Sequence, residues 1–309
     1  MTERLMLLDT ASLYFRAFYG VPDSLKAADG TPVNAVRGLL DIISRLVTDY
    51  EPTQLVACWD DDWRPAWRVE LIPSYKAHRV VEVVVTGPDV EEAPDPLVVQ
   101  IPLIREVLGI LGIPIVGAAE HEADDVIGSL ATQASVPVDV VTGDRDLFQL
   151  VDDASGVRVI YTARGMSKLE VLTDASVVGR YGVLPEQYAD FAALRGDASD
   201  GLPGVKGIGE KTAASLLKDF VDLDGIRAAA VDASVPLSAT MRARLTDASA
   251  YLDVAPKVVE VVRDLELGEF DATIRPLEGD AIAAFEHFAE RWNLGGAAPR
   301  VLAALGNVG

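Results

Sequence analysis

The sequence predicts an α/β fold in which helices flank a mostly parallel central sheet and a helical region follows. Three observations support this prediction. In the first two thirds of the 309 residues, short apolar runs of strand length alternate with longer segments whose apolar residues recur at helical spacing. Helical segments between strands are typical of the crossovers that join parallel strands. After residue 184 the pattern changes to short helices separated by glycine turns.

The expected elements follow in chain order. Strands are predicted where short apolar runs end in polar residues, over 5–8, 54–59, 113–116, 138–142 and 157–161. Helices are predicted where apolar residues recur every three or four positions, over 36–47, 97–111, 122–134, 188–194 and 210–220. The alanine-rich final third is expected to be mostly helical, with one strand over 258–262.

The change of pattern divides the chain into two expected parts. An α/β core over 1–184 precedes a helical part over 185–309 that packs on it. The stretch 80–96 fits neither pattern, because it opens with Val-Val-Glu-Val-Val-Val and then becomes acidic and proline-rich. We expect it to form an excursion from the core.

Composition excludes several classes of protein. Half of the residues are hydrophobic and a quarter are charged, which excludes a disordered or fibrous chain. The single cysteine, Cys58, cannot form an intramolecular disulfide, so a reducing, cytoplasmic location is expected. No apolar run is long enough to span a membrane.

Acidic residues follow the ends of the predicted strands. Nine of them lie at strand ends, at a helix start or in the loop before a glycine-rich turn: Asp9, Asp60, Glu122, Asp124, Asp125, Asp144, Asp146, Asp197 and Asp200. In an open α/β sheet the carboxyl ends of the strands form the ligand-binding edge. Carboxylates that share one pocket repel each other unless cations lie between them. The pattern therefore predicts two or more Mg²⁺ or Mn²⁺ ions, an arrangement used for phosphodiester cleavage.

Each acidic residue also has an ordinary explanation as a helix cap, a turn former or a partner of the helix dipole. Five such groups at the ends of apolar runs are less well explained in this way. Other chemistries fit poorly: Ala11 stands where an aspartyl phosphatase would need its second acid, and no Gly-x-Ser-x-Gly motif occurs. The three histidines show no metal-binding spacing.

The net charge is −21, with 48 acidic and 27 basic residues, which by itself argues against a polyanionic partner. Two segments have the opposite balance. Over 63–79, four basic residues accompany only Glu70, and the aromatic residues Trp63, Trp67 and Tyr75 lie among them. This composition suits stacking on nucleic-acid bases, although a half-buried amphipathic segment would have the same composition.

The second basic segment, 202–218, contains the glycine-rich turn. It is not a P-loop, because Glu210 separates Gly209 from Lys211 and no strand precedes it. A helix, tight turn and second helix would instead present backbone N–H groups to one phosphate of a nucleic acid. A plain helical hairpin with glycine caps remains the alternative.

Together these motifs resemble the 5′ nuclease family, which includes flap endonucleases and the amino-terminal 5′ exonuclease domain of bacterial DNA polymerase I. The matching residues span roughly 5–220 in the family's order: Leu7-Leu-Asp9 with Arg16, Asp60, Tyr75-Lys76 with Arg79, Glu122-Ala-Asp-Asp125, Thr142-Gly-Asp-Arg-Asp146, and Gly196-Asp-Ala-Ser-Asp200 leading into Leu202-Pro-Gly-Val-Lys-Gly-Ile-Gly-Glu-Lys-Thr212. The resemblance implies a metal-dependent nuclease with a helix-hairpin-helix variant that grips duplex DNA. It also implies a monovalent cation such as K⁺ in the turn.

The resemblance assigns roles residue by residue. It makes the nine acids the metal ligands, with Asp125, Asp144, Lys76 and Arg79 as the catalytic residues. The DNA contacts that it implies are Arg16, Lys76, Arg79, Lys206, Gly207, Gly209, Lys211 and Thr212. The chain departs from the family at three points. The spacing to Arg68 favours Asp61 over Asp60 as a ligand, although the strand end favours Asp60. Gly201 replaces the usual Asn, and 80–96 is acidic where basic residues are expected.

The sequence therefore predicts a stand-alone, structure-dependent DNA 5′-3′ exonuclease and 5′-flap endonuclease of replication and repair. Its partner would be DNA with a 5′ end or 5′ flap next to duplex, and it would act as a monomer. Two alternatives remain: a non-catalytic protein that binds DNA structures, and a metal-dependent RNA nuclease.

Overall fold

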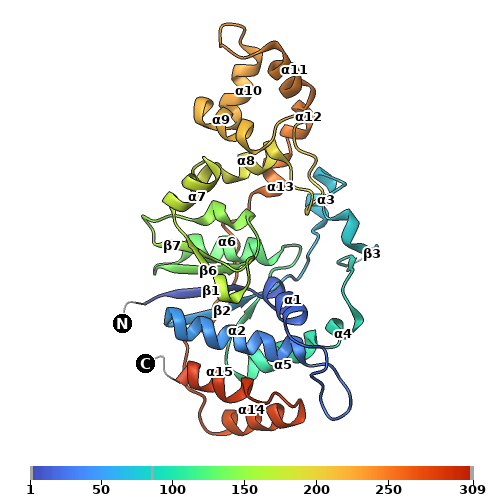
Figure 1. Cartoon of the computed structure of the whole chain (residues 1–309), viewed down its shortest axis with the longest axis vertical. Helices are drawn as coiled ribbons and strands as arrows, with labels where there is room; N and C mark the ends of the chain where they lie inside the picture. The colour runs from blue at the N-terminus through green and yellow to red at the C-terminus, as the bar shows by residue number, and fades with distance from the viewer. Residues whose placement is uncertain (1–2, 85–86, 307–309) are drawn as a thin grey trace.

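A six-stranded sheet lies at the centre of the computed structural model, which describes residues 3–84 and 87–306 (Figure 1). Its spatial order is β5-β2-β1-β6-β7-β8, and only β8 runs antiparallel to its neighbour. The strands are β1 (Leu5–Asp9), β2 (Gln54–Cys58), β5 (Ile115–Val116), β6 (Val138–Thr142), β7 (Val157–Tyr161) and β8 (Glu170–Leu172). The mostly parallel sheet and the five strands predicted for the α/β core are confirmed, whereas the short β8 was not predicted.

The register places the acidic strand ends at one edge of the sheet. Asp9, the last residue of β1, pairs with Cys58, the last residue of β2. Leu8 pairs with Val141 of β6, one residue before that strand ends. The residues that follow β2 and β6 therefore emerge beside Asp9.

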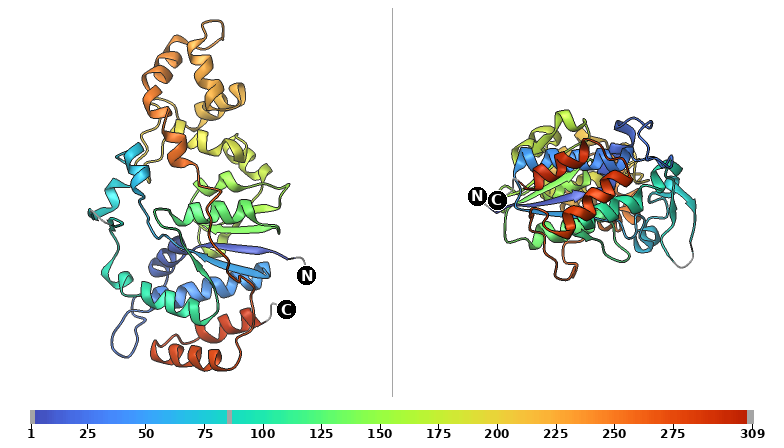
Figure 2. Two further views of the ribbon diagram at one scale, coloured as in Figure 1. Left: turned by 180° about the vertical axis from the view of Figure 1, so that it is seen from behind. Right: turned by 90° about the horizontal axis from the view of Figure 1, so that it is seen from below.

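Two layers of helices cover the sheet. One hydrophobic core lies under α1 (Thr10–Gly20), α2 (Asn34–Tyr50), α5 (Ile101–Ile110), α14 (Asp280–Arg291) and α15 (Ala297–Gly306). The other face packs against α6 (Ala123–Gln133), α7 (Asp174–Tyr181) and α8 (Tyr188–Arg195). The C-terminal helices α14 and α15 thus return to the core and lie next to α2 and α5 (Figures 1 and 2).

The helical region stands at the opposite end of the long axis from α14 and α15 (Figure 1). It comprises α9 (Glu210–Phe220), α10 (Leu223–Val231), α11 (Ala239–Asp247), α12 (Ser249–Leu252) and α13 (Ala255–Val259). From residue 260 the chain runs back along the core toward α14, where the N–H of Leu55 donates to the carbonyl of Ala272 (2.8 Å).

The predicted strand over 258–262 is wrong. Residues 258 and 259 end α13, and the following residues are extended but join no sheet ladder. Side chains accept their backbone hydrogen bonds instead: the N–H of Val261 donates to Gln149 (3.1 Å) and that of Val262 to Asp125 (2.9 Å). The valine run is apolar because this segment is buried against α6, not because it is a strand.

The predicted helix over 97–111 is split into α4 (Asp95–Val98) and α5. The break lies at Gln100, which is fully buried. Its side chain accepts hydrogen bonds from the N–H groups of Ala35 and Val36 at the start of α2, at 2.8 and 3.3 Å. Pro102 then stands near the start of α5, a position that tolerates its missing N–H.

The excursion carries a small antiparallel hairpin, β3 (Val80–Glu82) with β4 (Val90–Glu91). Before it, α3 (Ala66–Leu71) and a 3-10 turn over Ala77–Arg79 form the rest of the connection from β2. Further 3-10 turns lie at Asp146–Leu150, Met166–Lys168 and Pro185–Gln187. In the described part of the chain, no helix is long and apolar enough to cross a membrane.

Candidate active site

A cavity of about 230 Å³ lies at the carboxyl edge of β1, β2 and β6. Five of the predicted metal ligands line it, together with both predicted catalytic cations: Asp9, Asp60, Glu122, Asp124, Asp144, Lys76 and Arg79. These residues come from three strand ends, the start of α6 and the connection after α3. The sheet register therefore brings together the acids that the sequence placed at separate strand ends.

Local hydrogen bonds hold the lining carboxylates at the strand ends. Asp9 caps α1, because its Oδ1 accepts from the N–H of Ser12 (3.1 Å), and its Oδ2 accepts from the hydroxyl of Thr142 (2.7 Å). Asp60 accepts from the N–H of Ala123 (2.8 Å), which ties the end of β2 to the start of α6. Asp9 and Asp60 thus fix the starts of α1 and α6 and at the same time line the cavity as predicted ligands.

Asp60, not Asp61, faces the cavity. The carboxylate of Asp61 lies against Gly117, where an added Cβ would stand 2.5 Å from it. Asp61 lines a different surface depression, with Asp62 and Glu120. The geometry therefore favours Asp60 as the ligand.

Asp125 lies behind the cavity and does not line it. Its two oxygens accept from Arg68, each at 2.7 Å, and the N–H groups of Glu122 (3.1 Å) and Val262 (2.9 Å) also donate to them. The side chain is fully buried. In this arrangement Asp125 positions the start of α6, whereas the sequence predicted a catalytic ligand.

Arg68 is the partner that sequence reasoning missed. Its side chain is only 2 % exposed and also donates to Glu122 (3.0 Å) and to the carbonyls of Val258 (3.0 Å) and Glu260 (3.3 Å). It therefore joins α3, α6 and the chain after α13. In the sequence, only the spacing of seven residues between Asp61 and Arg68 pointed to Arg68. That spacing bears on the choice between Asp60 and Asp61 as a metal ligand and does not indicate a buried ion pair.

The stacking surface predicted over 63–79 is not formed. Arg68 is buried, Arg64 pairs with Asp89 (2.5 Å), and the hydroxyl of the buried Tyr75 donates to Glu122 (2.8 Å). Trp67 donates to a backbone carbonyl, and Trp63 lines the cavity. The segment is the half-buried amphipathic alternative, and of its three aromatic residues Tyr75 packs behind Glu122.

The two cations on the cavity wall already have carboxylate partners. Lys76 Nζ lies 2.7 Å from Glu122 Oε1. Arg79 donates to Asp200 Oδ1 (3.3 Å) and to the carbonyl of Ser199 (2.8 Å), and Glu91 of β4 stands 4.0 Å from it. These contacts link the cavity to the loop before the glycine turn.

Besides Asp125, three predicted ligands lie outside the cavity lining. Asp197 accepts from Arg195 (2.9 Å) and from Ser199, and Asp200 pairs with Arg79. Asp146 is buried, and its Oδ1 has no hydrogen-bond partner in the described structure. An orphaned carboxylate oxygen of this kind is costly unless a cation or water binds it.

Gly201, a departure from the family pattern, is required by its contacts. Its φ is +71°, and a Cβ would lie 2.1 Å from the carbonyl oxygen of Ser74. The N–H of Lys76 donates to the carbonyl of Asp200 (3.0 Å) beside it. The missing side chain lets this loop touch the segment that carries Lys76.

Burial and mutual repulsion raise the pKa values of the clustered acids. Burial, opposed by the Thr142 hydrogen bond and assisted by the charge of Asp60, raises the pKa of Asp9 to about 7. Burial raises the pKa of Asp200 to about 6, and it raises the pKa values of Asp124 and Asp146 well above the ordinary range. The folded site therefore holds more negative charge than it can stabilise alone.

The donor set fits hard divalent cations, which prefer carboxylate oxygens. The orphaned Oδ1 of Asp146 supports that fit. Within residues 3–84 and 87–306, however, no group of three or more His, Cys, Asp or Glu side chains is already arranged to hold a metal ion. Side-chain rotation would have to bring the lining carboxylates together around one.

The glycine turn has the backbone that the sequence predicted. Gly204 and Gly207 have φ of +64° and +80°, and a Cβ at Gly204 would lie 2.5 Å from the carbonyl oxygen of Arg195. Val205 and Ile208 anchor the turn in the core, while Lys206, Gly207, Gly209 and Lys211 are exposed and Thr212 is half-buried. Arg244 of α11 donates to the carbonyl of Gly207 (3.0 Å), a cationic contact that the sequence did not reveal.

Two family models match the chain. The 5'-3' exonuclease N-terminal resolvase-like domain matches residues 4–182, and the 5'-3' exonuclease C-terminal SAM fold matches residues 183–278. The chain belongs to the 5′-3′ exonuclease family. A 5'-3' exonuclease of Streptomyces coelicolor is 60 % identical over 300 residues, covering 97 % of this chain and 99 % of that protein.

Further relatives of this exonuclease-family chain include polymerases. A 5'-3' exonuclease of Mycobacterium tuberculosis is 51 % identical and covers 85 % of both chains. DNA polymerase I of Mycobacterium bovis is 40 % identical over 88 % of this chain but only 28 % of the polymerase. The resemblance to a nuclease that also occurs fused to a polymerase is confirmed.

Solved structures share the fold at low identity. T5 5'-exonuclease with bound zinc ions has a TM-score of 0.65 at 17 % identity and covers 98 % of this chain and all of that one. The catalytic core of Rad2 in complex with DNA substrate has a TM-score of 0.59 at 16 % identity and covers 98 % of this chain and 92 % of that one. These neighbours support the α/β core with its helical region.

Replacing Arg68 should be strongly destabilising. Arg68→Met leaves Asp125 buried without its cation and leaves Glu122 with Lys76 alone, which should lower the free energy of unfolding by about 3–5 kcal/mol. Arg227→Met, which breaks an ion pair with Asp253 that is 34 % and 54 % exposed, should change it by less than about 1 kcal/mol. Urea unfolding of both variants measures the difference, and equal effects would contradict the role given to Arg68.

The metal-free protein should lose stability as pH rises from about 4 to 7. Because the pKa of Asp9 is about 7 when folded and near 3.8 otherwise, the unfolded chain binds fewer protons across this window. One proton contributes at most about 1.4 kcal/mol per pH unit. Urea unfolding in chelator should show this fall, and Asp9→Asn should make it shallower without removing it, because Asp200 also has a raised pKa. Stability that rises across the window in wild type would contradict the assignment.

Proposed function

We propose that this 5′-3′ exonuclease-family protein is a divalent-metal-dependent DNA nuclease that cleaves at 5′ ends and 5′ flaps next to duplex, in replication and repair. The observation that carries the proposal is the cavity, in which five of the predicted ligand carboxylates and two cations meet at the carboxyl edge of the sheet. A protein that only bound DNA would gain nothing from acids that repel phosphate.

The residues that would hold divalent ions are the lining acids Asp9, Asp60, Glu122, Asp124 and Asp144, with Asp146, Asp197 and Asp200 behind them. When bound, two such ions would activate water and neutralise the charge that develops on the phosphate. Divalent ions are also present in the T5 5'-exonuclease structure named above. Mg²⁺ or Mn²⁺ is the proposed occupant.

Lys76 and Arg79 would hold the phosphate that is cleaved. Both line the cavity together with the carboxylates. Lys76 is fixed by Glu122 and by the buried Tyr75 behind it, so its ammonium group is positioned before substrate arrives. Positively charged groups preorganised in this way stabilise charge without further reorganisation.

The glycine turn would bind the duplex part of the substrate. Lys206, Gly207, Gly209, Lys211 and Thr212 form it, at the end of the molecule that carries α9 to α11 (Figure 1). Exposed N–H groups and lysines suit a backbone phosphate, which is read without sequence. A K⁺ ion in this turn remains part of the proposal, with the carbonyl of Gly207 already bonded to Arg244.

A monomer acting in the cytoplasm is also proposed. An RNA nuclease is the second candidate, since the cavity chemistry alone does not select the sugar. Incubation of a 5′-flap DNA and of the same flap with an RNA strand, each with Mn²⁺ or with chelator, tests the proposal. Metal-dependent cleavage of the DNA flap is expected; cleavage of the RNA strand alone would favour the second candidate.

Substitution of an acid that lines the cavity should lower the cleavage rate, whereas substitution of an acid that does not line it should leave the rate unchanged. Asp60→Asn and Asp144→Asn should lower flap cleavage by about a hundredfold or more, because each removes a ligand. Asp61→Asn is the matched control, and its activity should stay near wild type because Asp61 faces away from the cavity. Single-turnover cleavage assays measure this. A larger loss for Asp61→Asn than for Asp60→Asn would reverse the assignment.

The lysines of the turn should affect binding rather than chemistry. Lys206→Ala or Lys211→Ala should each reduce the slope of log affinity against log salt by about 0.9, because one phosphate contact is lost. kcat/KM should fall while single-turnover cleavage at saturating DNA stays near normal. An unchanged salt slope with a collapsed single-turnover rate would instead place these lysines at the chemical step.

A further inference from the structure

Glu91 of β4 lines the carboxylate cavity, although it is not one of the nine predicted ligands. The other lining acids lie close to strand ends or at the start of α6, whereas Glu91 comes from the excursion over 80–96. That stretch departs from the family pattern because it is acidic where basic residues are expected. Glu91 is therefore a further carboxylate that reaches the cavity from outside the sheet.

Two contacts tie the chain on both sides of Glu91 to the segment that carries Arg79. The N–H of Glu92 donates to the carbonyl of Arg79 (2.7 Å). On the other side, the carboxylate of Asp89 pairs with Arg64 (2.5 Å), and both of these side chains are largely buried. The backbone of Glu91 is thus held at the cavity wall, while its own carboxylate makes no hydrogen bond within the described residues.

Arg79 has one terminal nitrogen beside Glu91. Its Nη2 donates to the carbonyl of Ser199 (2.8 Å) and to Asp200 (3.3 Å). Its Nη1 makes no hydrogen bond within the described residues, and Glu91 Oε1 lies 4.0 Å from it, beyond hydrogen-bond distance. Nη1 is therefore a donor that a substrate phosphate could use, and an acid already stands beside it.

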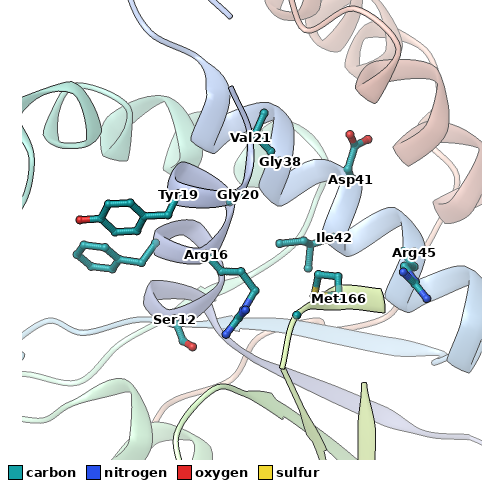
Figure 3. A pocket seen from close by; sticks show the side chains of 13 residues that line it. Ser12, Arg16, Tyr19, Gly20, Val21, Gly38, Asp41, Ile42, Arg45 and Met166 are labelled. Atoms are coloured by element: carbon teal, nitrogen blue, oxygen red, sulfur yellow. The ribbon is translucent and has the colours of Figure 1, made fainter. Parts of the chain in front are cut away.

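The cavity has few cations to offer a phosphate. Lys76 is held by Glu122 at 2.7 Å. Arg16 lines a different pocket, between α1, α2 and the turn that holds Met166 (Figure 3). Among the described residues that line the cavity, only Lys76 and Arg79 are cationic, against six acids. A carboxylate beside Nη1 of Arg79 therefore bears directly on how firmly the cavity can hold a phosphate.

We propose that Glu91 is an internal competitor for the substrate phosphate at Arg79. A phosphodiester and a carboxylate are both anionic hydrogen-bond acceptors, so they compete for the same guanidinium nitrogen. When a phosphate binds Nη1, Glu91 has to rotate away or remain beside it as a like charge, and either event weakens binding. The inference rests on the proposed nuclease function, to which it adds a residue that lowers the affinity of the cavity for DNA.

Equilibrium binding in chelator tests the competitor without cleavage. Glu91→Gln removes the charge and keeps the size of the side chain. It should tighten binding of a fluorescent 5′-flap DNA by about three- to tenfold, the factor expected for one unit charge at roughly 4 Å in a water-like medium. An unchanged Kd would overturn the proposal.

The matched control is Glu82→Gln, which removes the same charge from an exposed position on β3 that does not line the cavity. Its Kd should stay within about twofold of wild type, because a distant surface charge is screened by salt. Equal gains in Glu82→Gln and Glu91→Gln would reduce the effect to net charge and contradict competition in the cavity.

A further comparison asks whether the effect of Glu91 depends on Arg79. In an Arg79→Gln background the phosphate has lost the nitrogen for which Glu91 competes, so adding Glu91→Gln should tighten binding by less than about twofold. A gain as large as in the wild-type background would mean that Glu91 repels DNA independently of Arg79, and the proposed competition would be wrong.

Cleavage assays in Mn²⁺ separate a competitor from a metal ligand and from the function on which the inference rests. Glu91→Gln should lower KM for flap DNA by a similar factor and leave the Mn²⁺ concentration for half-maximal cleavage within about twofold of wild type. A rise of about tenfold or more in that concentration would make Glu91 a metal ligand and overturn the proposal. If wild type cleaves no flap, the nuclease function itself fails, and the binding comparison in chelator still decides the role of Glu91.

Discussion

The buried ion pair between Arg68 and Asp125 is the contact on which the rest of the site depends. The guanidinium of Arg68, on α3, bonds to the start of α6 and to two carbonyls at the end of α13 and just after it. Glu122 is oriented by the same group and in turn holds Lys76. Three segments distant in sequence thus converge on one cation, and the cavity wall is built on that convergence. A fully desolvated pair of this kind is a source of specificity in geometry more than of net stability.

The same convergence explains how so many acids can share one edge of the sheet. Some are neutralised within the fold, since Asp125 accepts from Arg68 and Asp197 accepts from Arg195. Others, led by Asp9, are left with raised pKa values because burial is not offset by a cation. Contact with an arginine does not by itself set the division, because Asp200 pairs with Arg79 and burial still raises its pKa to about 6. Buried acids whose pKa values stay raised make the folded state dependent on an added positive charge, and that dependence is what a metal site requires.

The strands, the parallel sheet and the positions of Asp9, Asp60 and Asp144 could be predicted, because the acid follows its apolar run directly and parallel strands align their ends. The burial of Arg68 and Tyr75 could not. Both lie in a basic and aromatic segment, and such a composition suits a surface that binds DNA as well as a segment buried in the core. Only their contacts with Glu122 show that these two side chains are buried. The strand predicted over 258–262 failed for a related reason: valines that pack on α6 in an extended chain resemble valines of a strand, and the acceptors that replace the ladder, Gln149 and Asp125, lie more than a hundred residues away.

The acidic excursion shows why net charge was a poor guide to the partner. Asp89 pairs with Arg64, and Glu91 lies 4.0 Å from Arg79 at the cavity. Acids of the excursion therefore neutralise basic residues of the segment that precedes it. This pairing neutralises positive charge on the cavity wall that carries Arg79. Within the described residues, Arg16 and the exposed lysines of the glycine turn form no such ion pair. A chain with net charge −21 can therefore still meet a polyanion, provided that its free cations lie along one path from the turn to the cavity. The total charge would then set how strongly the rest of the surface repels DNA, while the cations at the cavity and at the glycine turn would set where DNA is held.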